Sequence, residues 1–551
     1  MNKHNEYEGR RQPASIDGIS SGNRELGTPI HRSYQPSHGD ATPGLGDSME
    51  RAEGFHPSRS GVDQPLGSEE YLADLEAPIL LDQPLPQDSK KRRKLLKKQT
   101  KHKSRGRKYL RRALTLVAII IIAGLGALAY KFYDTQRQIL AGGGKAPAVC
   151  DTSISPELLT KEGDGRVNIL LVGVGGPEHS DGPNATDTLL IASIDPVNNT
   201  ADLLSIPRDL WVRIPTNGSA KINAAYLYGR ETAEGDEAEQ QRAGLELLDK
   251  TLAPIVGVPI HYRALVDFAA FREVVNALGG VDINVPKDLA VSEQLWDEAT
   301  GKNYKLNVLA GQQHFDGTKA LFFSRSRKTS SGGDFDRTER QKLVMIALKE
   351  KGITAGTFSN PIRIIQLLES LGENVYTDFD TESIKCLYAR MSAIPSSAIK
   401  SLDTVTPPND LLTTANLGGT SVVRPKAGLF NYDDLQAYVR KSFRDGFLAK
   451  ENASVAVYNA TSTDGAATQQ ADLLKTYGYN VTTVDSAPTL TNPAQTVVVD
   501  LGEQDDRYTK HYLGLRYSTT VTDKMPESTG ITPPSGTRFV VILGSDVTDS
   551  N

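Results

Sequence analysis

From residue 166 onward, short apolar runs alternate along the chain with stretches that have the apolar spacing of a helix, whereas the first 89 residues show no hydrophobic period. The runs that predict buried strands are Val167–Val172, Thr188–Ile194, Ala201–Ile206, Ile260–Val266 and Val281–Val285. The stretches that predict helices are residues 238–253, 268–278, 361–372, 382–394 and 432–446. This alternation predicts an α/β fold.

A composition break near Ala449–Asn452 predicts the start of a second, smaller domain. The pattern repeats there on a shorter scale. Strands are predicted over residues 454–458, 480–484, 496–499 and 539–543, with a helix over residues 465–477. We expect a small α/β domain of about 100 residues.

One segment before the α/β region has a different character. Residues 90–112 are dominated by Lys and Arg, and Ala113–Tyr130 carries no charge. About 20 apolar residues cross a bilayer, so we expect a transmembrane helix over residues 109–131. The basic block predicts a single-pass protein of the cell membrane with a cytoplasmic N-terminus and extracytoplasmic domains. It also makes membrane lipid an expected partner.

The remaining parts of the N-terminal region follow from composition. Residues 1–108 are predicted to be a disordered cytoplasmic tail that ends in the basic block, and residues 132–165 a stalk with a joint at Gly142–Gly144. The net charge of −5 gives no indication of a nucleic-acid partner. The two cysteines, Cys150 and Cys386, both lie on the predicted exported side. They either pair there or remain a stalk thiol and a buried helical thiol, and the sequence leaves both open.

Four arginines fall within sixteen residues: Arg325, Arg327, Arg337 and Arg340. The run before them, Ala320–Phe323, is apolar and predicts a strand, on which Arg325 and Arg327 point to the same face. Arg337 and Arg340 open a helical pattern and share a face there. A strand, a Gly-containing loop and a helix start would bring all four guanidinium groups around one anion. A solvated basic surface is the alternative, and for Arg340 alone a pair with Asp336 is another.

A further basic residue, Arg208, follows directly after a predicted strand, with Pro207 before it and Asp209 after it. Proline ends the ladder, and strand ends are where functional sites commonly form. A local ion pair of Arg208 with Asp209 is the alternative. His179, in the preceding Gly-rich loop, is interpreted as an exposed loop residue rather than a ligand.

These motifs, in this order and spacing, resemble the LytR-CpsA-Psr family. The matching residues are Asp187–Thr188, Ser205–Asp209, Lys221–Tyr226, Val266–Phe268, Gly279–Val281, Arg325–Arg327, and Asp334, Arg337, Arg340 and Gln341. The resemblance implies a catalytic domain over residues 166–446, with a mixed sheet flanked by helices. Residues 452–548 look like the LytR C-terminal domain.

The resemblance also implies a function: transfer of a glycopolymer from a polyprenyl-pyrophosphate carrier to peptidoglycan. On this reading Arg208, Asp209, Arg325 and Arg327 are catalytic, and Arg337, Arg340, Gln341 and Lys221 bind substrate. Asp187 holds Mg²⁺ through oxygen. Part of the apolar core would hold the polyprenyl tail.

The chain departs from the family pattern at two positions. Gly175 stands where the family usually has Asp, and Ala185 where it usually has Arg. Asp181 is the expected substitute for the missing metal ligand. The departures keep two alternatives open: a non-catalytic envelope-binding protein and a polyprenyl-pyrophosphate hydrolase.

Overall fold

The computed structural model describes residues 143–151, 153–177, 179, 182, 184–297, 299–326, 334–354, 366–367, 371–489, 491–502 and 505–547, and isolated residues between 90 and 126. Nearly all of the predicted cytoplasmic tail, and most of the apolar stretch 109–131 and of the helix expected over 361–372, therefore lie outside the described residues. Within the described part of the chain, no helix combines the length and apolar character needed to cross a bilayer.

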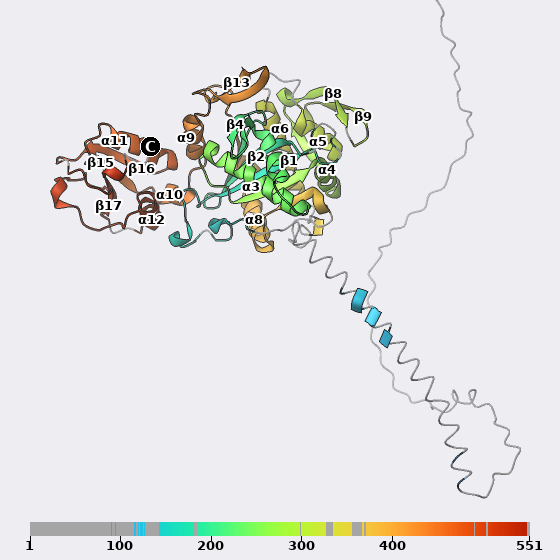
Figure 1. Ribbon diagram of the computed structural model, residues 1–551, viewed down its shortest axis with the longest axis horizontal. Helices are drawn as coiled ribbons and strands as arrows, with labels where there is room; N and C mark the ends of the chain where they lie inside the picture. Colours follow the sequence, from blue (N-terminus) through green and yellow to red (C-terminus); the bar gives the residue numbers. More distant parts are fainter. Residues whose placement is uncertain are drawn as a thin grey trace, which may run out of the picture. The chain divides into compact units, whose positions relative to one another are not determined.

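A mixed sheet forms the centre of the larger domain (Figure 1). Its strands, in spatial order, are β11 (Val375–Thr377), β6 (Tyr262–Asp267), β1 (Val167–Val174), β2 (Thr186–Asp195), β3 (Thr200–Ser205) and β12 (Ile399–Leu402). Strands β1, β2 and β3 form an antiparallel meander, whereas β6 pairs parallel to β1 and β12 parallel to β3. The predicted α/β fold with a mixed sheet is confirmed.

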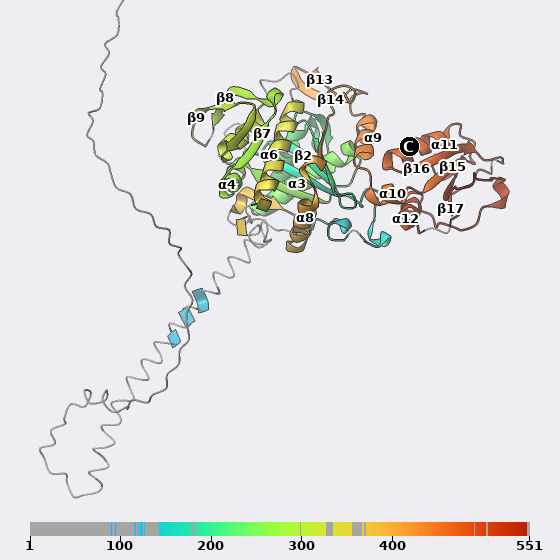
Figure 2. The ribbon, with the colours of Figure 1, turned by 180° about the vertical axis from the view of Figure 1, so that it is seen from behind.

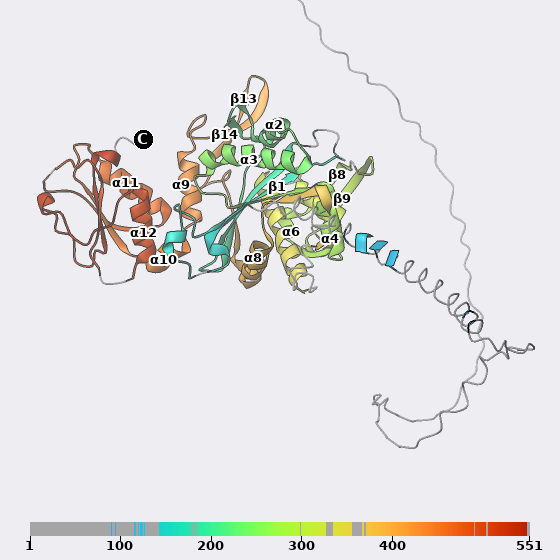
Figure 3. The ribbon, with the colours of Figure 1, turned by 60° about the horizontal axis from the view of Figure 1, so that its bottom comes forward.

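Helices cover both faces of this sheet, as Figure 3 shows for α3 on one side of β1 and α6 and α8 on the other. The described α-helices of the larger domain are α2 (Ala225–Glu231), α3 (Glu237–Val256), α4 (Phe268–Ala277), α5 (Gly317–Arg325), α6 (Asp334–Thr354), α8 (Thr381–Ala393) and α9 (Asp433–Ser442). Alternate residues of β1 enter different cores: Leu170 packs with Leu248 of α3, and Ile169 with Ile384 of α8. Burial on both faces explains why the strands read as nearly continuous apolar runs.

In the described part of the chain, four two-stranded sheets lie outside the central sheet, and Figure 2 shows β7, β8, β9, β13 and β14 from three of them. They are β4 (Trp211–Ile214) with β5 (Gly218–Lys221), β7 (Val281–Val285) with β10 (Gly311–Phe315), β8 (Val291–Asp297) with β9 (Lys302–Val308), and β13 (Leu412–Leu417) with β14 (Thr420–Pro425). The strand predicted over residues 281–285 is present, but it pairs with β10 instead of joining the central sheet.

The strand predicted at Ala320–Phe323 is wrong, because these residues lie in helix α5. The carboxylate of Asp316 caps this helix by accepting from the Lys319 N–H, and Ala320, Phe322 and Phe323 are buried. A short apolar run that is buried on every side gives no period by which a strand differs from a helix. Arg325 therefore ends a helix, and the predicted face shared with Arg327 does not exist as a strand face.

The C-terminal domain has its own sheet, in the order β16, β15, β18, β17. The elements are α10 (Gly446–Glu451), β15 (Ser454–Asn459), α11 (Ala466–Tyr477), β16 (Asn480–Ser486), β17 (Val497–Asp500), α12 (Arg507–Arg516) and β18 (Phe539–Leu543). Each predicted element is present, and α10 and α12 are additional helices that the apolar pattern did not indicate. The small second α/β domain is thus confirmed.

The described part of the predicted stalk is not a free connector but part of the fold. Ala146, Ala148 and Val149 are buried, and the Gly144 N–H donates to the Asp378 carbonyl at 3.1 Å. A β-carbon on Gly144 would lie 2.4 Å from the ring of Tyr262, so only glycine permits this approach. Composition alone predicted a stalk here because these residues become buried only against surfaces that residues distant in the sequence contribute.

A disulfide joins this segment to the larger domain. Cys150 and Cys386 of α8 are bonded, 236 residues apart in the sequence. Of the two possibilities that the sequence left open, the structure shows the pair.

We predict that replacing both cysteines with alanine lowers the free energy of unfolding by about 2–4 kcal/mol, because the bond closes a long loop in the unfolded chain. Urea unfolding of the two proteins measures the difference. Alkylation of the exported, unreduced, unfolded chain should label neither cysteine, and two labelled thiols would contradict the pairing.

Candidate active site

Asp187 is an acidic residue near the start of β2, beside the end of β1. Its carboxylate pairs with the guanidinium of Arg208 through one oxygen, and the other oxygen lies 3.9 Å from Nη2 of Arg325. The Asp187 side chain is 13% exposed and that of Arg208 35%, so solvent screens these charges only in part. One carboxylate thus joins two arginines that are 117 residues apart in the sequence.

Arg208 lies where the chain leaves β3, as predicted. The turn there is fixed by backbone bonds: the Leu210 N–H donates to the Pro207 carbonyl, and the Asn223 N–H to the Arg208 carbonyl. Asp209 points to a different partner, Nζ of Lys221, at 2.8 Å. The local Arg208–Asp209 ion pair that the sequence left open is also present, with Nε of Arg208 3.9 Å from the Asp209 carboxylate, in addition to the pair of Arg208 with Asp187.

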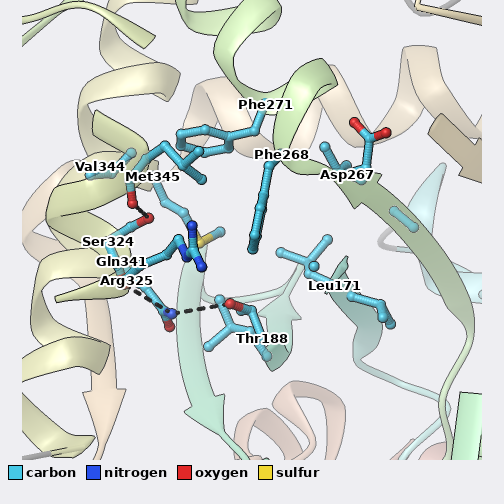
Figure 4. A pocket seen from close by; sticks show the side chains of 16 residues that line it. Leu171, Thr188, Asp267, Phe268, Phe271, Ser324, Arg325, Gln341, Val344 and Met345 are labelled. Carbon is cyan, nitrogen blue, oxygen red and sulfur yellow. Dashed lines mark hydrogen bonds between the residues drawn. The ribbon is translucent and has the colours of Figure 1, made fainter. Parts of the chain in front are cut away.

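Arg325 and Gln341 approach from the other side of the site. The Arg325 guanidinium lies 4.1 Å from the ring centroid of Phe268, the first residue of α4. Nε2 of Gln341 lies 3.4 Å from Oγ1 of Thr188 and 3.5 Å from the Ser324 carbonyl (Figure 4). Helix α6 thereby contacts both the end of α5 and strand β2.

Several of these side chains line a cavity of about 250 Å³. It is lined by Asp187, Thr188, Arg208, Leu295, Trp296, Phe322, Arg325 and Arg337. Three guanidinium groups and one carboxylate leave a net charge of about +2 on the described lining, which favours an anion with more than one negative charge.

A second cavity, of about 190 Å³, adjoins the first and is almost entirely apolar. Thr188 and Arg325 line both cavities. Figure 4 shows Leu171, Phe268, Phe271, Val344 and Met345 around the apolar cavity, with Gln341 on the side toward Thr188. No hydrophobic period marks this space, since its lining residues have the pattern of ordinary core; only the family resemblance implied that part of the core would hold a tail.

Arg340 is not at the cavity, and its predicted role in binding substrate is corrected. Its side chain is fully buried and donates to the carbonyls of Ser326 at 3.0 Å and Leu289 at 3.4 Å. Burial lowers the pKa of this guanidinium, which Asp336 partly offsets. Residues three apart on a helix diverge by about 60°, enough to place Arg337 in the cavity lining and Arg340 in the core.

Asp209 and Lys221 pair beside the cavity without being among its lining residues. Arg327 and Asp181 lie outside the described residues.

Residues that could hold a metal ion are few in this region. Asp187 is the acidic member of the described cavity lining, and no group of three His, Cys, Asp or Glu side chains suited to a metal occurs among the described residues. At Gly175, a β-carbon would lie 2.5 Å from the ring of His179. His179 is therefore packed over Gly175 and edge-on against Phe268, rather than exposed in its loop. One carboxylate oxygen suits Mg²⁺, which commonly keeps waters and substrate phosphates as its other ligands.

Family models match both domains of this chain. Residues 134–424 match the LytR_cpsA_psr family, and residues 452–546 match a domain described as LytR cell envelope-related transcriptional attenuator. A Bacillus subtilis protein, polyisoprenyl-teichoic acid–peptidoglycan teichoic acid transferase TagV, is 30% identical over 308 residues, which cover 54% of this chain and 71% of that protein. A Bacillus cereus TagU transferase of the same description is 31% identical over 49% of this chain and 79% of its own length.

The crystal structure of B. subtilis TagV is 28% identical, covers 52% of this chain and 97% of that one, and has a TM-score of 0.38. The family match extends over more than half of the chain and includes every described residue of the arginine-lined cavity. This chain is a member of the LytR-CpsA-Psr family.

Proposed function

We propose that this protein transfers a glycopolymer from a polyprenyl-pyrophosphate carrier to peptidoglycan. One observation carries the proposal: a cavity lined by three arginines adjoins an apolar cavity, and Arg325 lines both. A ligand that fits both has an anionic head and a hydrocarbon tail. The relatives TagV and TagU are named as transferases of teichoic acid from a polyisoprenyl carrier to peptidoglycan, which supports the same class of reaction here.

The arginines bind the pyrophosphate. Arg208, Arg325 and Arg337 come from three separate segments, so their planar donors approach from different directions. Without ligand, Asp187 offsets the repulsion between Arg208 and Arg325 and keeps both aimed into the cavity. Gln341 holds the end of α5 through the Ser324 carbonyl and thereby helps to position Arg325.

The apolar cavity takes the start of the polyprenyl tail. Leu171, Phe271, Val344 and Met345 offer branched, aromatic and thioether surface, and the lining also includes the charged residues Asp267 and Arg325. Burying hydrocarbon in such a space is favourable by about 25 cal/mol per Å². The tail thus contributes affinity, and the arginines fix the position of the pyrophosphate from which the tail extends.

In the reaction, a hydroxyl of a peptidoglycan sugar attacks the phosphorus next to the glycan. The new bond joins that oxygen to phosphorus, the bond to the bridging oxygen breaks, the hydroxyl proton is released, and polyprenyl phosphate leaves. Negative charge grows on the phosphoryl and bridging oxygens during this step. Arg208, Arg325 and Arg337 stabilise it because they are already oriented before the reaction begins.

Asp187 would hold Mg²⁺ when the metal and the substrate phosphates are present. A bound divalent cation would neutralise charge on the phosphoryl oxygens. In the same state, Arg208 exchanges its carboxylate partner for phosphate. The proposed second acid is Asp181.

The functional test is incubation of the full-length protein in detergent with a polyprenyl-pyrophosphoryl glycan and Mg²⁺, with and without peptidoglycan oligomers, followed by mass analysis. We expect a phosphodiester-linked product only when the oligomers are present. Hydrolysed glycan phosphate in both samples would indicate a hydrolase, and unchanged carrier an envelope-binding protein.

In the same assay, Arg325→Ala should reduce transfer about ten- to a hundredfold, because a charge-assisted bond to phosphate contributes ~1.5–3 kcal/mol. Arg325→Lys should lie between the two, since lysine keeps the charge but loses the fork. We expect the same order for Arg327. Arg213, which lies over Phe430 away from the cavity, supplies the control, and Arg213→Ala should transfer normally. Unfolding of both Arg325 variants in urea should resemble that of the parent, and full activity of Arg325→Ala would refute the site.

Metal dependence separates the two proposed acids from other carboxylates. Asp187→Asn should remove most of the response of the rate to Mg²⁺, and Asp181→Ala should weaken it nearly as much. Asp472→Asn, at an exposed position on α11, should leave the Mg²⁺ titration unchanged. An unaltered titration for Asp181→Ala would show that another oxygen, such as water, takes its place.

We also propose that the basic block and the apolar stretch 109–131 anchor the protein as a single-pass membrane protein with a cytoplasmic N-terminus. Protease added outside intact cells should then digest the chain beyond residue 131 and leave peptides of the tail intact, as measured by mass spectrometry. Permeabilised cells provide the control, in which the tail is digested too. Loss of tail peptides in intact cells would reverse the orientation.

A further inference from the structure

An exposed indole borders the arginine-lined cavity, and the reaction proposed above gives it no role. Trp296 lies on β8 and is 52% exposed, although it lines the same cavity as Arg208, Arg325 and Arg337. The other exposed positions on its face of the strand are polar, Ser292 and Gln294. A single exposed apolar residue is ordinary on a protein surface, but one at the rim of a polar cavity faces whatever that cavity binds.

The neighbours of Trp296 hold it in place. Leu295 is paired across the hairpin with Tyr304, whose ring stacks on Phe322 of α5 with centroids 4.8 Å apart. On the other side, the buried Asp297 accepts from Thr300 at 3.0 Å and lies 3.5 Å from a guanidinium nitrogen of Arg272. Both residues next to Trp296 are therefore anchored to the domain, so the backbone that carries the indole has little freedom to lose on binding.

The two cavities assign the two substituents of the pyrophosphate to opposite sides. The apolar cavity, beyond Arg325, takes the hydrocarbon tail and does not include Trp296. The substituent on the other phosphate then extends on the side of the indole. In the proposed substrate that substituent is a sugar, which has hydroxyl groups around its edge and an apolar C–H face.

We propose that Trp296 is a specificity-determining residue that packs against the C–H face of the sugar linked to the pyrophosphate. This inference rests on the proposed function. The indole supplies a flat apolar surface for the ring, and its N–H stays available to a hydroxyl or to water. Contact of this kind excludes water from both surfaces and adds affinity only when a sugar is present.

The chain contains two tryptophans, so Trp211→Phe leaves Trp296 as the only indole. The full-length variant in detergent is titrated with a short-chain polyprenyl-pyrophosphoryl disaccharide and, separately, with the same polyprenyl pyrophosphate without sugar. We expect both to bind and only the first to shift the emission of Trp296. An equal shift with both would overturn the proposal, because the tail or the phosphates would then be the contact.

Calorimetry on the parent background measures the corresponding affinities. Trp296→Ala should weaken binding of the sugar-bearing carrier about tenfold and leave the sugar-free carrier unchanged. Trp296→Phe should recover part of the loss. Leu309→Ala, which removes a 64% exposed apolar side chain that does not line the cavity, is the matched control and should bind both normally.

The remaining outcomes are also decisive. Failure of both carriers to bind the parent protein would refute the proposed function itself, whereas normal binding of both carriers to Trp296→Ala would refute only the role of the indole. An emission shift with glycan-free vesicles, of the size expected for the sugar-bearing carrier, would show that Trp296 contacts lipid and would overturn the sugar contact.

Discussion

The site depends on holding several guanidinium groups close together before any anion is present. At a separation of a few ångströms, like charges in a partly buried cavity repel by several kcal/mol. Asp187 offsets this repulsion, because its two oxygens face Arg208 and Arg325. A bound pyrophosphate would offset the same repulsion. The charge of the arginines is therefore balanced by Asp187 in the free protein and by the phosphates when the ligand is bound.

Side chains outside the cavity fix the backbone that carries Arg325. Arg340 and Gln341 are consecutive residues of α6, and each bonds to a carbonyl at the end of α5, Ser326 and Ser324 respectively. The last carbonyls of a helix lack partners within the helix, so these side chains satisfy groups that would otherwise be buried without one. Arg340 thus contributes through the position of its neighbours, even though it is not among the lining residues of the cavity.

The segment before β1 connects the two domains. Cys150 is bonded to α8 of the larger domain, whereas the Ile154 carbonyl accepts from the Tyr508 hydroxyl and Glu162 pairs with Arg516 of the C-terminal domain. Ala148, Ile154 and Leu159 also enter the core of that domain. Burial raises the pKa of the nearby Asp445, whose carboxylate accepts from Tyr512 and from the first N–H groups of α10. The part of the chain next to the predicted membrane span therefore belongs to both domains.

The sequence by itself determined the α/β alternation, the two domains and most of the groups at the site, because these depend on local period and on residue chemistry. Arg208 at a strand end and Arg337 at a helix start were found in this way. The tertiary structure alone decided that Ala320–Phe323 is helical, that Arg340 enters the core, that Cys150 meets Cys386 and that an apolar cavity adjoins the arginines. The physical reason is the same in each case, because these outcomes depend on which surfaces, distant in the sequence, meet in the fold. Where a segment is buried on all sides, its sequence also lacks the hydrophobic period by which a helix differs from a strand and a buried face from an exposed one.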